Sequence, residues 1–418
     1  MGFQQGLSGL NATSKNLEVI GNNIANTNTY GAKSSRAEFA DMYASAMNGA
    51  GSGNVGIGVT VQAVSQQFTQ GNIAATQNPL DLAINGAGFF QVRDGDKPTA
   101  YTRNGQFKLD RDGFVVNAQG YKLMGYAADA SGAILPGQAQ PLQLPTAGIT
   151  PAATDRIRME MNLDARAPVT AGATLDTTDP TTYNNATSLA VYDAKGQDVA
   201  LTYYFQKAAT DTWNVYVTAN GTPLAVDGLG NPAPSTQIVF PANGGTPTSP
   251  VGPVTLNIPP STNASGALAL AIPNVALNVS GATQYGSPFG VTDLSQNGYA
   301  AGQMIGIQFE PNGVITARYS NGQSKPAGQV EIATFRNPQG LQPMGGNAWA
   351  FTYATGDPIV GVPGDGNLGA LQSGALEESN VDMTAELVSM ITAQRVYQAN
   401  AQTIKTQDQV LQTLVNLR

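Results

Sequence analysis

The 418-residue sequence contains no cysteine and no histidine. Disulfide bonds, thiolate chemistry, zinc sites built from these residues and histidine acid–base catalysis are therefore excluded. Charged residues make up only 11% of the chain, and no cluster of lysine or arginine offers a footprint for nucleic acid or an acidic lipid surface. We expect no catalytic site, no metal, no cofactor and no nucleic-acid partner, so the protein is not predicted to be an enzyme.

Long apolar segments are also missing. No stretch approaches the roughly 18 continuous apolar residues that a membrane-spanning helix needs, so we expect no membrane insertion. The first thirty residues lack a basic segment followed by an apolar one, which predicts that no cleavable signal peptide is present.

Glycine and proline, in contrast, are abundant, with 48 and 25 residues. Together with a hydrophobic content of 41% this composition indicates short strands joined by turns rather than disorder. The length predicts two to four domains.

The two ends of the chain carry the helical patterns. Apolar residues recur at alternating steps of three and four, which is the spacing of a coiled-coil seam. The N-terminal seam consists of Leu7, Leu10, Leu17 and Ile24, with Ser14 and Gly21 between them. The C-terminal seam consists of Leu387, Met390, Gln394, Tyr397, Ala401, Ile404, Asp408, Leu411 and Val415. Asp382 is a suitable N-cap for the second helix, which we expect to run to Arg418.

The first helix is followed by an unusual polar stretch, GNNIANTNTYGAK, at residues 21–33. Asparagine caps and turns the backbone, and glycine adopts positive φ without strain. We therefore expect Ile24 to belong to the helix and the chain to leave it from Asn26 onward. Asn26, Asn28 and Gly31 are the predicted hinge residues.

The region between the helices has strand patterns. In FFQVRDGDKPTAYTRNGQFKLDRDGFVVNAQGYKLMGY, residues 89–126, turn signals occur at Asp94-Gly95, Asn104-Gly105, Asp112-Gly113 and Gln119-Gly120. Asn-Gly and Asp-Gly pairs favour type I′ hairpin turns. A second hairpin region at 305–323 has Asn312-Gly313 and Asn321-Gly322.

Residues 151–288 differ in composition and are rich in Thr, Ala, Asn, Gly and Pro. Alternating apolar residues, at 199–205 and again at 213–217, predict strands there. We therefore expect a mainly β protein with α-helical termini, in which an outer β domain is inserted into an inner one and the terminal helices pair like a coiled coil. The predicted parts are the terminal helices at 1–30 and 380–418, an extended linker region at 31–75 and 360–379, the inner β domain at 76–150 and 289–359, and the outer β domain at 151–288.

Two motifs resemble binding loops. Residues 51–56 match GxGxxG, but a strand pattern instead of a helix follows, so we interpret the segment as a linker. Asp110-Arg111-Asp112-Gly113 resembles the start of a calcium loop whose later ligands are absent, and we interpret it as a turn.

Three segments together resemble a known family. LSGLNATSKNLEVIGNNIANTNTYGAKSSRAEFADMY near the N-terminus, NPLDLAINGAGFFQV with YTRNGQFKLDRDGFVVNAQGYKLMGY in the inner β region, and NVDMTAELVSMITAQRVYQANAQTIKTQDQVLQTLVNLR at the C-terminus are similar to the bacterial flagellar rod and hook proteins. NLDARAP at 162–168 and SLAVYDAKGQDVALTYYF at 188–205 resemble the hook members, which carry a large inserted outer domain.

The resemblance implies a structural subunit that polymerises with itself into a flexible curved tube, a universal joint that connects rod to filament and transmits torque. It implies an extracellular location in the flagellum, export by the type III apparatus without a cleaved signal peptide, and contacts with the rod protein, the hook cap and the hook–filament junction proteins. The polymerisation residues would be the apolar seam residues Leu7, Leu10, Leu17, Ile24, Leu387, Met390, Tyr397, Ile404, Leu411 and Val415.

Two alternatives stay open at this point. A distal rod protein is similar at both ends but shorter, and a secreted β-rich surface adhesin belongs to a different class. We further expect the terminal helices to be disordered in the free chain, because one pair of helices buries little apolar area against the entropy of ordering it.

Overall fold

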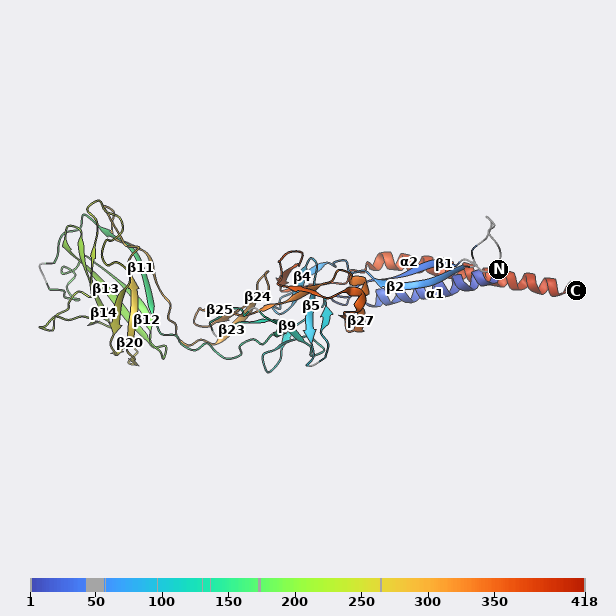
Figure 1. Ribbon diagram of the computed structural model, residues 1–418, viewed down its shortest axis with the longest axis horizontal. Coiled ribbons are helices and arrows are strands. Elements are labelled where there is room, and N and C mark those ends of the chain that lie inside the picture. The colour runs from blue at the N-terminus through green and yellow to red at the C-terminus, as the bar shows by residue number, and fades with distance from the viewer. Residues whose placement is uncertain are drawn as a thin grey trace. The chain divides into compact units, whose positions relative to one another are not determined.

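The computed structural model describes residues 2–42, 56, 58–95, 97–129, 131–135, 137–171, 174–263 and 265–416, and it forms two compact units (Figure 1). The first unit contains the described residues up to Thr146, those of Gly306–Ala317 and those from Ser324 onward. The second contains Ala147–Ile305 and Arg318–Gln323. The chain thus enters the second unit from the first and returns to it. The fold class is mainly β with helical termini, as predicted.

Two helices lie side by side in the first unit (Figure 1). Helix α1 spans Gly2–Ala25 and helix α2 spans Met383–Asn416. The 34 residues of α2 correspond to a length of about 50 Å. The Asp382 carboxylate accepts hydrogen bonds from the backbone N–H groups of Thr384 and Ala385, at 2.9 and 3.1 Å, which confirms the predicted N-cap. No helix in the described part of the chain combines the length and apolar character needed to cross a membrane.

The strands of the first unit are short. They are β1 Ser35–Met42, β2 Gly58–Gln66, β3 Ile73–Ala75, β4 Leu82–Asn85, β5 Phe89–Arg93, β6 Ala100–Thr102, β7 Lys108–Leu109, β8 Val115–Val116, β9 Lys122–Ala127, β10 Gln140–Pro141, β23 Met304–Phe309, β24 Val314–Tyr319, β25 Ser324–Val330, β26 Ile332–Thr334, β27 Gln342–Gly345, β28 Ala348–Ala350, β29 Ile359–Gly361, β30 Ala370–Ser373 and β31 Ala375–Glu377. Strands β23 and β24 extend into the second unit, and two 3₁₀ turns, η1 Pro338–Gly340 and η2 Tyr353–Thr355, complete the list.

The main sheet of this unit has the order β23-β24-β25-β9-β5-β6-β28-β27. Its core is a cluster of buried aliphatic and aromatic side chains that includes Leu82, Phe90, Val92 and Leu123. A second cluster of aromatic rings joins Phe89 and Trp349 to Phe68, which lies just after β2. We call this sheet with its two clusters the inner β region.

Segments from the two ends of the chain pair beside it. Strand β3 pairs with β31 and strand β4 with β30, both antiparallel, so each pair joins an N-terminal segment to a C-terminal one. In each pair, a segment that follows α1 therefore lies beside a segment that precedes α2. We call these two strand pairs the chain crossings. The β1–β2 hairpin packs on α1.

The turn predictions have mixed outcomes. Glycines 95, 113, 120, 313 and 322 have positive φ between 53° and 86°, but the residue before each does not, so these are not the predicted type I′ turns. Asn104-Gly105 is not a hairpin turn at all, because β6 and β7 do not pair with each other. Gly105 is needed there for space, since a Cβ atom would lie 1.6 Å from the carbonyl oxygen of Leu82. Asp110–Gly113 forms the predicted turn, held by the Asp110 side chain.

The second unit is entirely β within its described residues. Its strands are β11 Arg156–Asp164, β12 Asn185–Tyr192, β13 Asp198–Ala209, β14 Thr212–Ala219, β15 Thr222–Pro223, β16 Thr236–Val239, β17 Val254–Ile258, β18 Ser261–Thr262, β19 Leu268–Ala269, β20 Ile272–Asn278, β21 Thr283–Tyr285 and β22 Gly290–Gln296. One sheet has the order β17-β20-β11-β21 with β22 on β11, and the other has the order β12-β13-β14-β15 with β16 on β14.

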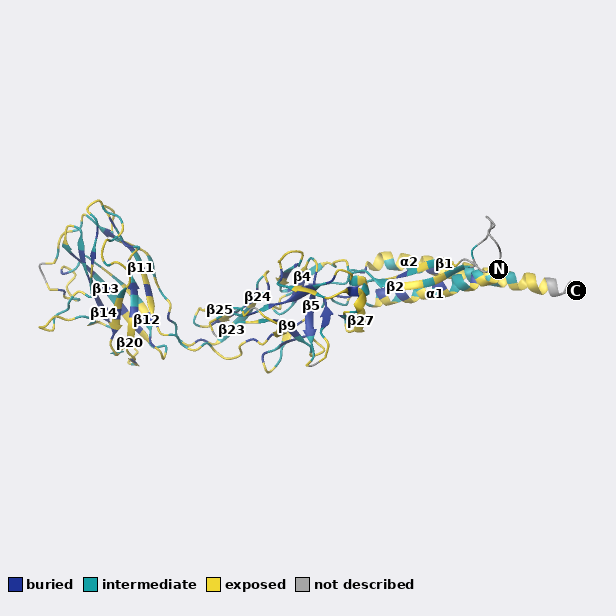
Figure 2. Ribbon diagram, viewed as in Figure 1, coloured by how far each residue is buried: buried dark blue, intermediate teal, exposed yellow. Residues whose placement is uncertain are grey.

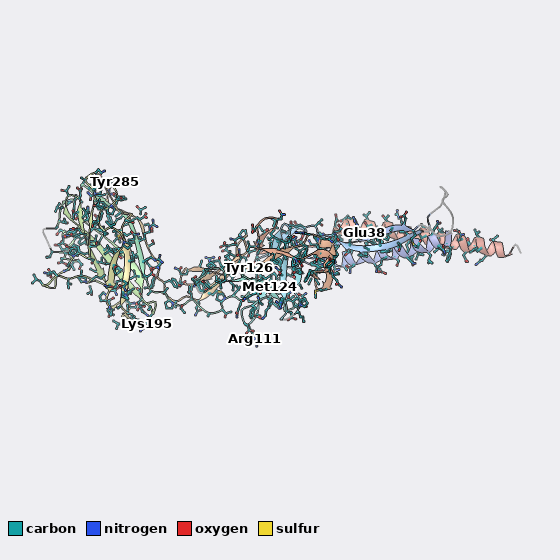
Figure 3. All side chains as sticks on the ribbon, in the orientation of Figure 1. Glu38, Arg111, Met124, Tyr126, Lys195 and Tyr285 are labelled. Carbon is teal, nitrogen blue, oxygen red and sulfur yellow. The ribbon has the colours of Figure 1, made fainter. Side chains whose placement is uncertain are left out.

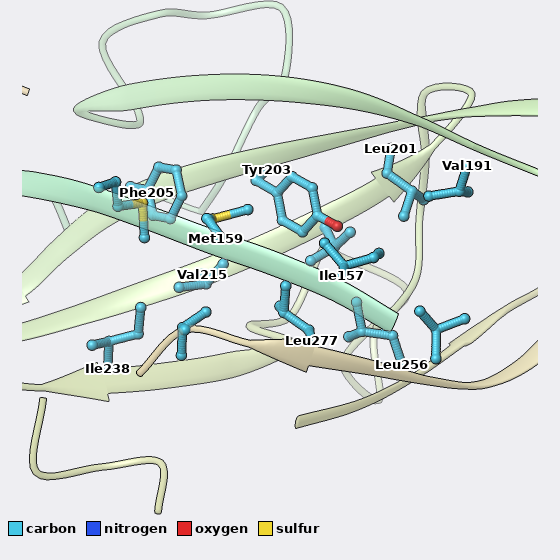
Figure 4. Close-up of a cluster of buried hydrophobic side chains, with 14 of the residues drawn as sticks. Ile157, Met159, Val191, Leu201, Tyr203, Phe205, Val215, Ile238, Leu256 and Leu277 are labelled. Carbon is cyan, nitrogen blue, oxygen red and sulfur yellow. The ribbon is translucent and has the colours of Figure 1, made fainter. Parts of the chain in front are cut away.

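The core of this unit is drawn from both sheets (Figure 4). The predicted alternation is confirmed, because Val199, Leu201, Tyr203 and Phe205 all have fully buried side chains. Trp213 is also fully buried, and its indole N–H donates to Gln284 at a distance of 3.0 Å. The unit extends beyond the predicted end of the outer domain at residue 288, since β22 pairs antiparallel with β11.

Candidate functional site

The helix pair is the site that the sequence singles out, and its interior contains small residues. A Cβ atom on Gly6 would lie 3.0 Å from Cγ1 of Ile404, and one on Gly9 would lie 2.8 Å from Nδ2 of Asn400. The α1 backbone therefore approaches α2 closely at these two glycines. Farther along, the Asn23 amide donates to the Glu386 carboxylate at 2.9 Å.

These contacts define a seam in α1 that is displaced by one residue from the leucine seam. Its positions with a contact to α2 are Gly6, Gly9 and Asn23, and the same alternating spacing in the sequence places Thr13, Asn16 and Ile20 between them. On α2 the facing positions include Glu386, Ala393, Asn400 and Ile404. Small and amide side chains permit a closer helix approach than leucine does. The apolar stripe of α1 consequently lies beside this seam and not within it.

The β1–β2 hairpin covers another side of α1. The Gln5 amide donates to the carbonyl oxygen of Gly56 at 2.7 Å, and the Ser8 hydroxyl accepts from the N–H of Val59 at 3.3 Å. Asn23 exchanges two hydrogen bonds of 2.8 Å with the backbone of Ser35. Asn23 thus connects α1 to both the hairpin and α2, a role that its position in a polar stretch did not indicate.

Much of the predicted polymerisation stripe is open to solvent (Figure 2). Leu7 is 44% exposed, Leu387 45% and Leu411 50%. Tyr397 is 37% exposed, and the side chain of Val415 lies outside the described residues. The remaining members are half-buried, namely Leu10, Leu17, Ile24, Met390 and Ile404. Among the described side chains of α2, Ala393 is the one that is buried.

An apolar groove of about 660 Å³ runs between α1, α2 and the hairpin. Phe39 and Val59 line it from the hairpin, and Val388 and Val396 line it from α2. Phe39, Val388 and Val396 are 41%, 60% and 46% exposed. The groove was not predicted from the sequence, although the alternation of Val59 and Val61 in the hairpin was a signal of an apolar face there.

The predicted hinge residues lie where the chain leaves helix α1. Helix α1 ends at Ala25, and the Asn26 amide donates to the carbonyl oxygen of Asn22 at 2.9 Å. Asn28 is exposed. Gly31 has a φ of 69°, its N–H donates to the carbonyl oxygen of Glu377 at 2.8 Å, and a Cβ atom there would lie 2.5 Å from the nitrogen of Asn104. The hinge role of these three residues stays a prediction.

Helix α1 contributes few charges to the surface of the helix pair. Helix α1 carries only Lys15 and Glu18, which form an exposed ion pair with each other. On the hairpin, the Glu38 carboxylate (Figure 3) accepts a hydrogen bond of 2.6 Å from Ser65. This bond, followed by one from Arg36, lowers the pKa of Glu38. Such a surface offers apolar area and hydrogen-bonding groups to a partner, with few charges to desolvate.

The described residues contain no group of acidic side chains that could hold a metal ion. Most of the GxGxxG segment, residues 51–55, lies outside them. What the helix pair offers is exposed apolar side chains and an apolar groove, against which another surface can pack.

Family models match four successive stretches of the chain. Residues 3–33 match the flagella basal body rod protein model, and residues 83–157 match the flagellar hook protein FlgE/F/G D1 domain. Residues 162–299 match the flagellar basal body protein FlaE D2 domain, and residues 372–417 match the flagellar basal body rod FlgEFG protein C-terminal model.

Similar proteins match over the full length. The chain is 40% identical to the flagellar hook protein FlgE of Salmonella typhimurium and 39% identical to that of Escherichia coli K12, with complete coverage of both chains in each case. It is 33% identical to the hook protein of Borreliella burgdorferi, over 99% of this chain and 98% of the other. A crystal structure of Helicobacter pylori FlgE2 shares the fold with a TM-score of 0.54, at 15% identity over 73% of this chain and all of the other.

Proposed function

Because this chain belongs to the family of flagellar hook proteins, we propose that it is the structural subunit of a bacterial flagellar hook. It polymerises with copies of itself into a flexible curved tube, a universal joint that connects the rod to the filament and transmits torque. The family is one of structural proteins and not of enzymes, and we extend this to the absence of any catalytic activity in this chain. The observation that carries the proposal is the exposed apolar surface of the helix pair.

The helices line the inside of the tube and make its axial contacts. We propose that the apolar stripes face neighbouring copies, through Leu7, Leu10, Leu17, Ile24, Leu387, Met390, Tyr397, Leu411 and Val415. Ile404, the remaining predicted member, lies against Gly6 of its own α1 instead. Exposed leucines on both helices support this proposal, since burying one contributes on the order of 1.5–3 kcal/mol. In one free chain nothing covers these exposed leucines. In a polymer, each copy can bury them against its neighbours.

The groove is a second part of the same surface, and its occupant is a second copy of this chain. Val388 and Val396 line the groove, while Leu387 and Ile391, their neighbours on α2, are exposed beside it. The apolar lining of the groove therefore continues onto the exposed side of α2 beside it. A neighbour that covers the stripe also reaches the groove, and its own exposed apolar side chains fit such a lining.

The parts of the chain have separate roles in this proposal. The helices at 1–30 and 380–418 form the inner tube, and the linker region at 31–75 and 360–379 leads to the inner β domain, which takes residues 76–146, 306–317 and 324–359. The outer domain, residues 147–305 with 318–323, forms wide polar contacts that slide as the tube bends, because small uncharged side chains make few fixed ion pairs. Asn26, Asn28 and Gly31 redirect the chain from the tube to the β domains.

The further partners follow from the place of a hook in the flagellum. They are the rod protein, the hook cap, the hook–filament junction proteins and the type III export apparatus, through which the chain passes without losing a signal peptide. The chain is extracellular once assembled, as part of the hook at the basal body.

Electron microscopy of assembled protein tests the proposal. The full chain is expressed in a flagellated bacterium whose own hook subunit gene is deleted, and purified chain is concentrated in parallel. We expect curved tubes on the cells and in vitro. Straight, short tubes would favour a distal rod protein, and a monomer that never polymerises would favour the adhesin alternative; either result overturns the proposal.

A further inference from the structure

A buried group of three charged side chains lies where both chain crossings meet the inner β region. The Glu377 carboxylate is completely buried at the end of β31. One of its oxygens accepts from the Lys33 ammonium at 2.6 Å, and the other accepts from the Arg103 guanidinium at 3.0 Å. The Lys33 side chain is also completely buried, and that of Arg103 is 5% exposed. In a chain with so few charges, this burial requires an explanation.

The three residues come from distant parts of the sequence. Lys33 follows the exit from α1, Arg103 follows β6 of the inner sheet, and Glu377 lies six residues before α2. The cluster thus joins the segment that leaves the first helix, the segment that enters the second, and the sheet between them. Among the ion pairs of the residues that the structure describes, no other set joins these three segments.

Backbone groups complete the cluster. Lys33 also donates to the carbonyl oxygen of Thr69 at 2.7 Å, and Arg103 donates to the carbonyl oxygen of Gly86 at 2.7 Å. The N–H of Gly71 donates to the Glu377 carboxylate at 2.9 Å. Two further segments are therefore tied to the same carboxylate and its cations.

Desolvation is the dominant influence on both cations. Burial lowers the pKa of Lys33 and of Arg103, and the attraction of Glu377 opposes it in each case. A buried ion pair is weak evidence for stability, because apolar residues of the same volume often serve as well. What an ionic cluster adds is geometry, since the two carboxylate oxygens of Glu377 accept from different cations, Oε1 from Lys33 and Oε2 from Arg103.

That geometry restricts motion. If the segment that carries Lys33 or the strand that carries Glu377 slid by one residue, a charged side chain would be left buried without its partner. Such a loss is strongly unfavourable. The ionic cluster consequently resists displacement in small steps, and this matters in a part that carries torque.

We propose that Lys33, Arg103 and Glu377 form an internal clamp that fixes the base of the helix pair to the inner β region as one rigid lever. This inference rests on the proposed function, in which torque passes between the tube and the outer parts. The changes of length that a bending hook needs then occur between subunits and at the contacts of the second unit. The segments at 31–75 and 360–379 act as a fixed connection and not as a joint, so Asn26, Asn28 and Gly31 set the direction of the chain without bending.

Hydrogen exchange on the full-length monomer tests the clamp without assembly. Glu377→Gln keeps the shape but leaves two buried cations, and Lys33→Met leaves a neutral pair of Arg103 and Glu377. The matched control is Glu378→Gln, because Glu378 is the next residue and its carboxylate has an exposed hydrogen bond of 3.0 Å to Asn72. We expect exchange at the Gly71 amide to become about a hundredfold faster in Glu377→Gln and about tenfold faster in Lys33→Met, with no change in the control.

Hooks assembled from the same variants give the second measurement. In tethered-cell experiments, we expect Lys33→Met hooks to twist farther under the same torque than wild-type or Glu378→Gln hooks. If Glu377→Gln does not fold, Lys33→Met decides the question. Equal Gly71 exchange in Lys33→Met and Glu378→Gln, or equal twist, overturns the clamp. A wild-type chain that forms no tubes refutes the proposed function alone, since the exchange measurement needs no tube.

Discussion

The second unit and the helix pair differ in how far they bury their apolar side chains. The second unit encloses a contiguous core of apolar side chains drawn from two sheets, with Trp213, Tyr203 and Phe205 fully buried. In α2, Ala393 is the one buried side chain among those described, while eight large hydrophobic side chains of the helix are exposed, namely Met383, Leu387, Val388, Ile391, Val396, Tyr397, Val410 and Leu411. The second unit buries its apolar side chains by itself, whereas the helix pair leaves many of its own exposed.

The difference teaches how one chain can be both a stable subunit and a polymer. A domain core stabilises the chain before assembly, and an uncovered helix surface keeps its apolar area for the neighbours. Substitutions should therefore separate the two regions: those in the core change the stability of the free chain, and those on the helix surface change assembly.

The largest expected effect is the loss of assembly. The double variant Leu387→Asp with Leu411→Asp places charges on the exposed stripe, and we expect it to form no tubes, because each carboxylate would be buried without a partner. The melting temperature of the free chain should stay unchanged, since both residues are about half exposed.

The control for this prediction is Thr406→Asp with Thr413→Asp, which adds the same charge at exposed polar positions of the same helix. Negative-stain electron microscopy and thermal unfolding are measured side by side. Normal tubes from the leucine variant would contradict the assignment of the stripe.

The second prediction compares the two regions in one sample of free chain. Amides of β13 and β14 should exchange only by global unfolding, with a free energy in the range of roughly 5–15 kcal/mol. Amides of α1 and α2 should exchange almost as fast as those of an unfolded peptide, because the pair buries too little to offset its ordering entropy. Hydrogen exchange read by NMR measures both, and strong protection of the helices in the monomer would refute this expectation.

A core substitution gives the third effect. Trp213→Ala should lower the free energy of unfolding of the second unit by about 3–5 kcal/mol, since it opens a cavity and removes the hydrogen bond to Gln284. Trp213→Phe, which keeps most of the ring volume, should cost less. Urea unfolding followed by circular dichroism measures the loss. Equal destabilisation by both variants would mean that the indole N–H, and not the packing, dominates at this position.

The smallest effect concerns the inner β region. Glu331 is buried and accepts hydrogen bonds from Tyr126 (Figure 3) at 2.8 Å and from Gln91 at 3.0 Å. Burial raises the pKa of Glu331 above its ordinary value of 4.5. The folded chain therefore holds this proton at pH values where the unfolded chain has released it, so the contribution of Glu331 to stability falls as pH rises above 4.5.

Glu331→Gln removes that titration. We expect the difference in melting temperature, wild type minus variant, to decrease between about pH 4 and pH 7. A difference that stays constant or increases over this interval would show that Glu331 is not held protonated by its surroundings. Because neither the helix pair nor the second unit contains Glu331, tube formation should not depend on it.

Local patterns in the sequence predicted a large part of this fold. Alternation fixed the strands that carry Val199 and Tyr203, the Asp382 cap marked the start of α2, and the polar stretch after Ile24 marked the end of α1. These signals work because side-chain period and capping act within a few residues. The turns were less predictable, since Asn104-Gly105 has the composition of a hairpin turn and serves a close approach to Leu82 instead.

The tertiary structure decided the features that depend on distant contacts. It put Gly6, Gly9 and Asn23 inside the helix pair and left the leucine stripe at its edge, because the closest approach of two helices is set by the smallest side chains and not by the most apolar ones. It also brought Lys33 and Glu377 together across 344 residues. A period in the sequence states which residues share a face, but only the packed chain determines what that face meets.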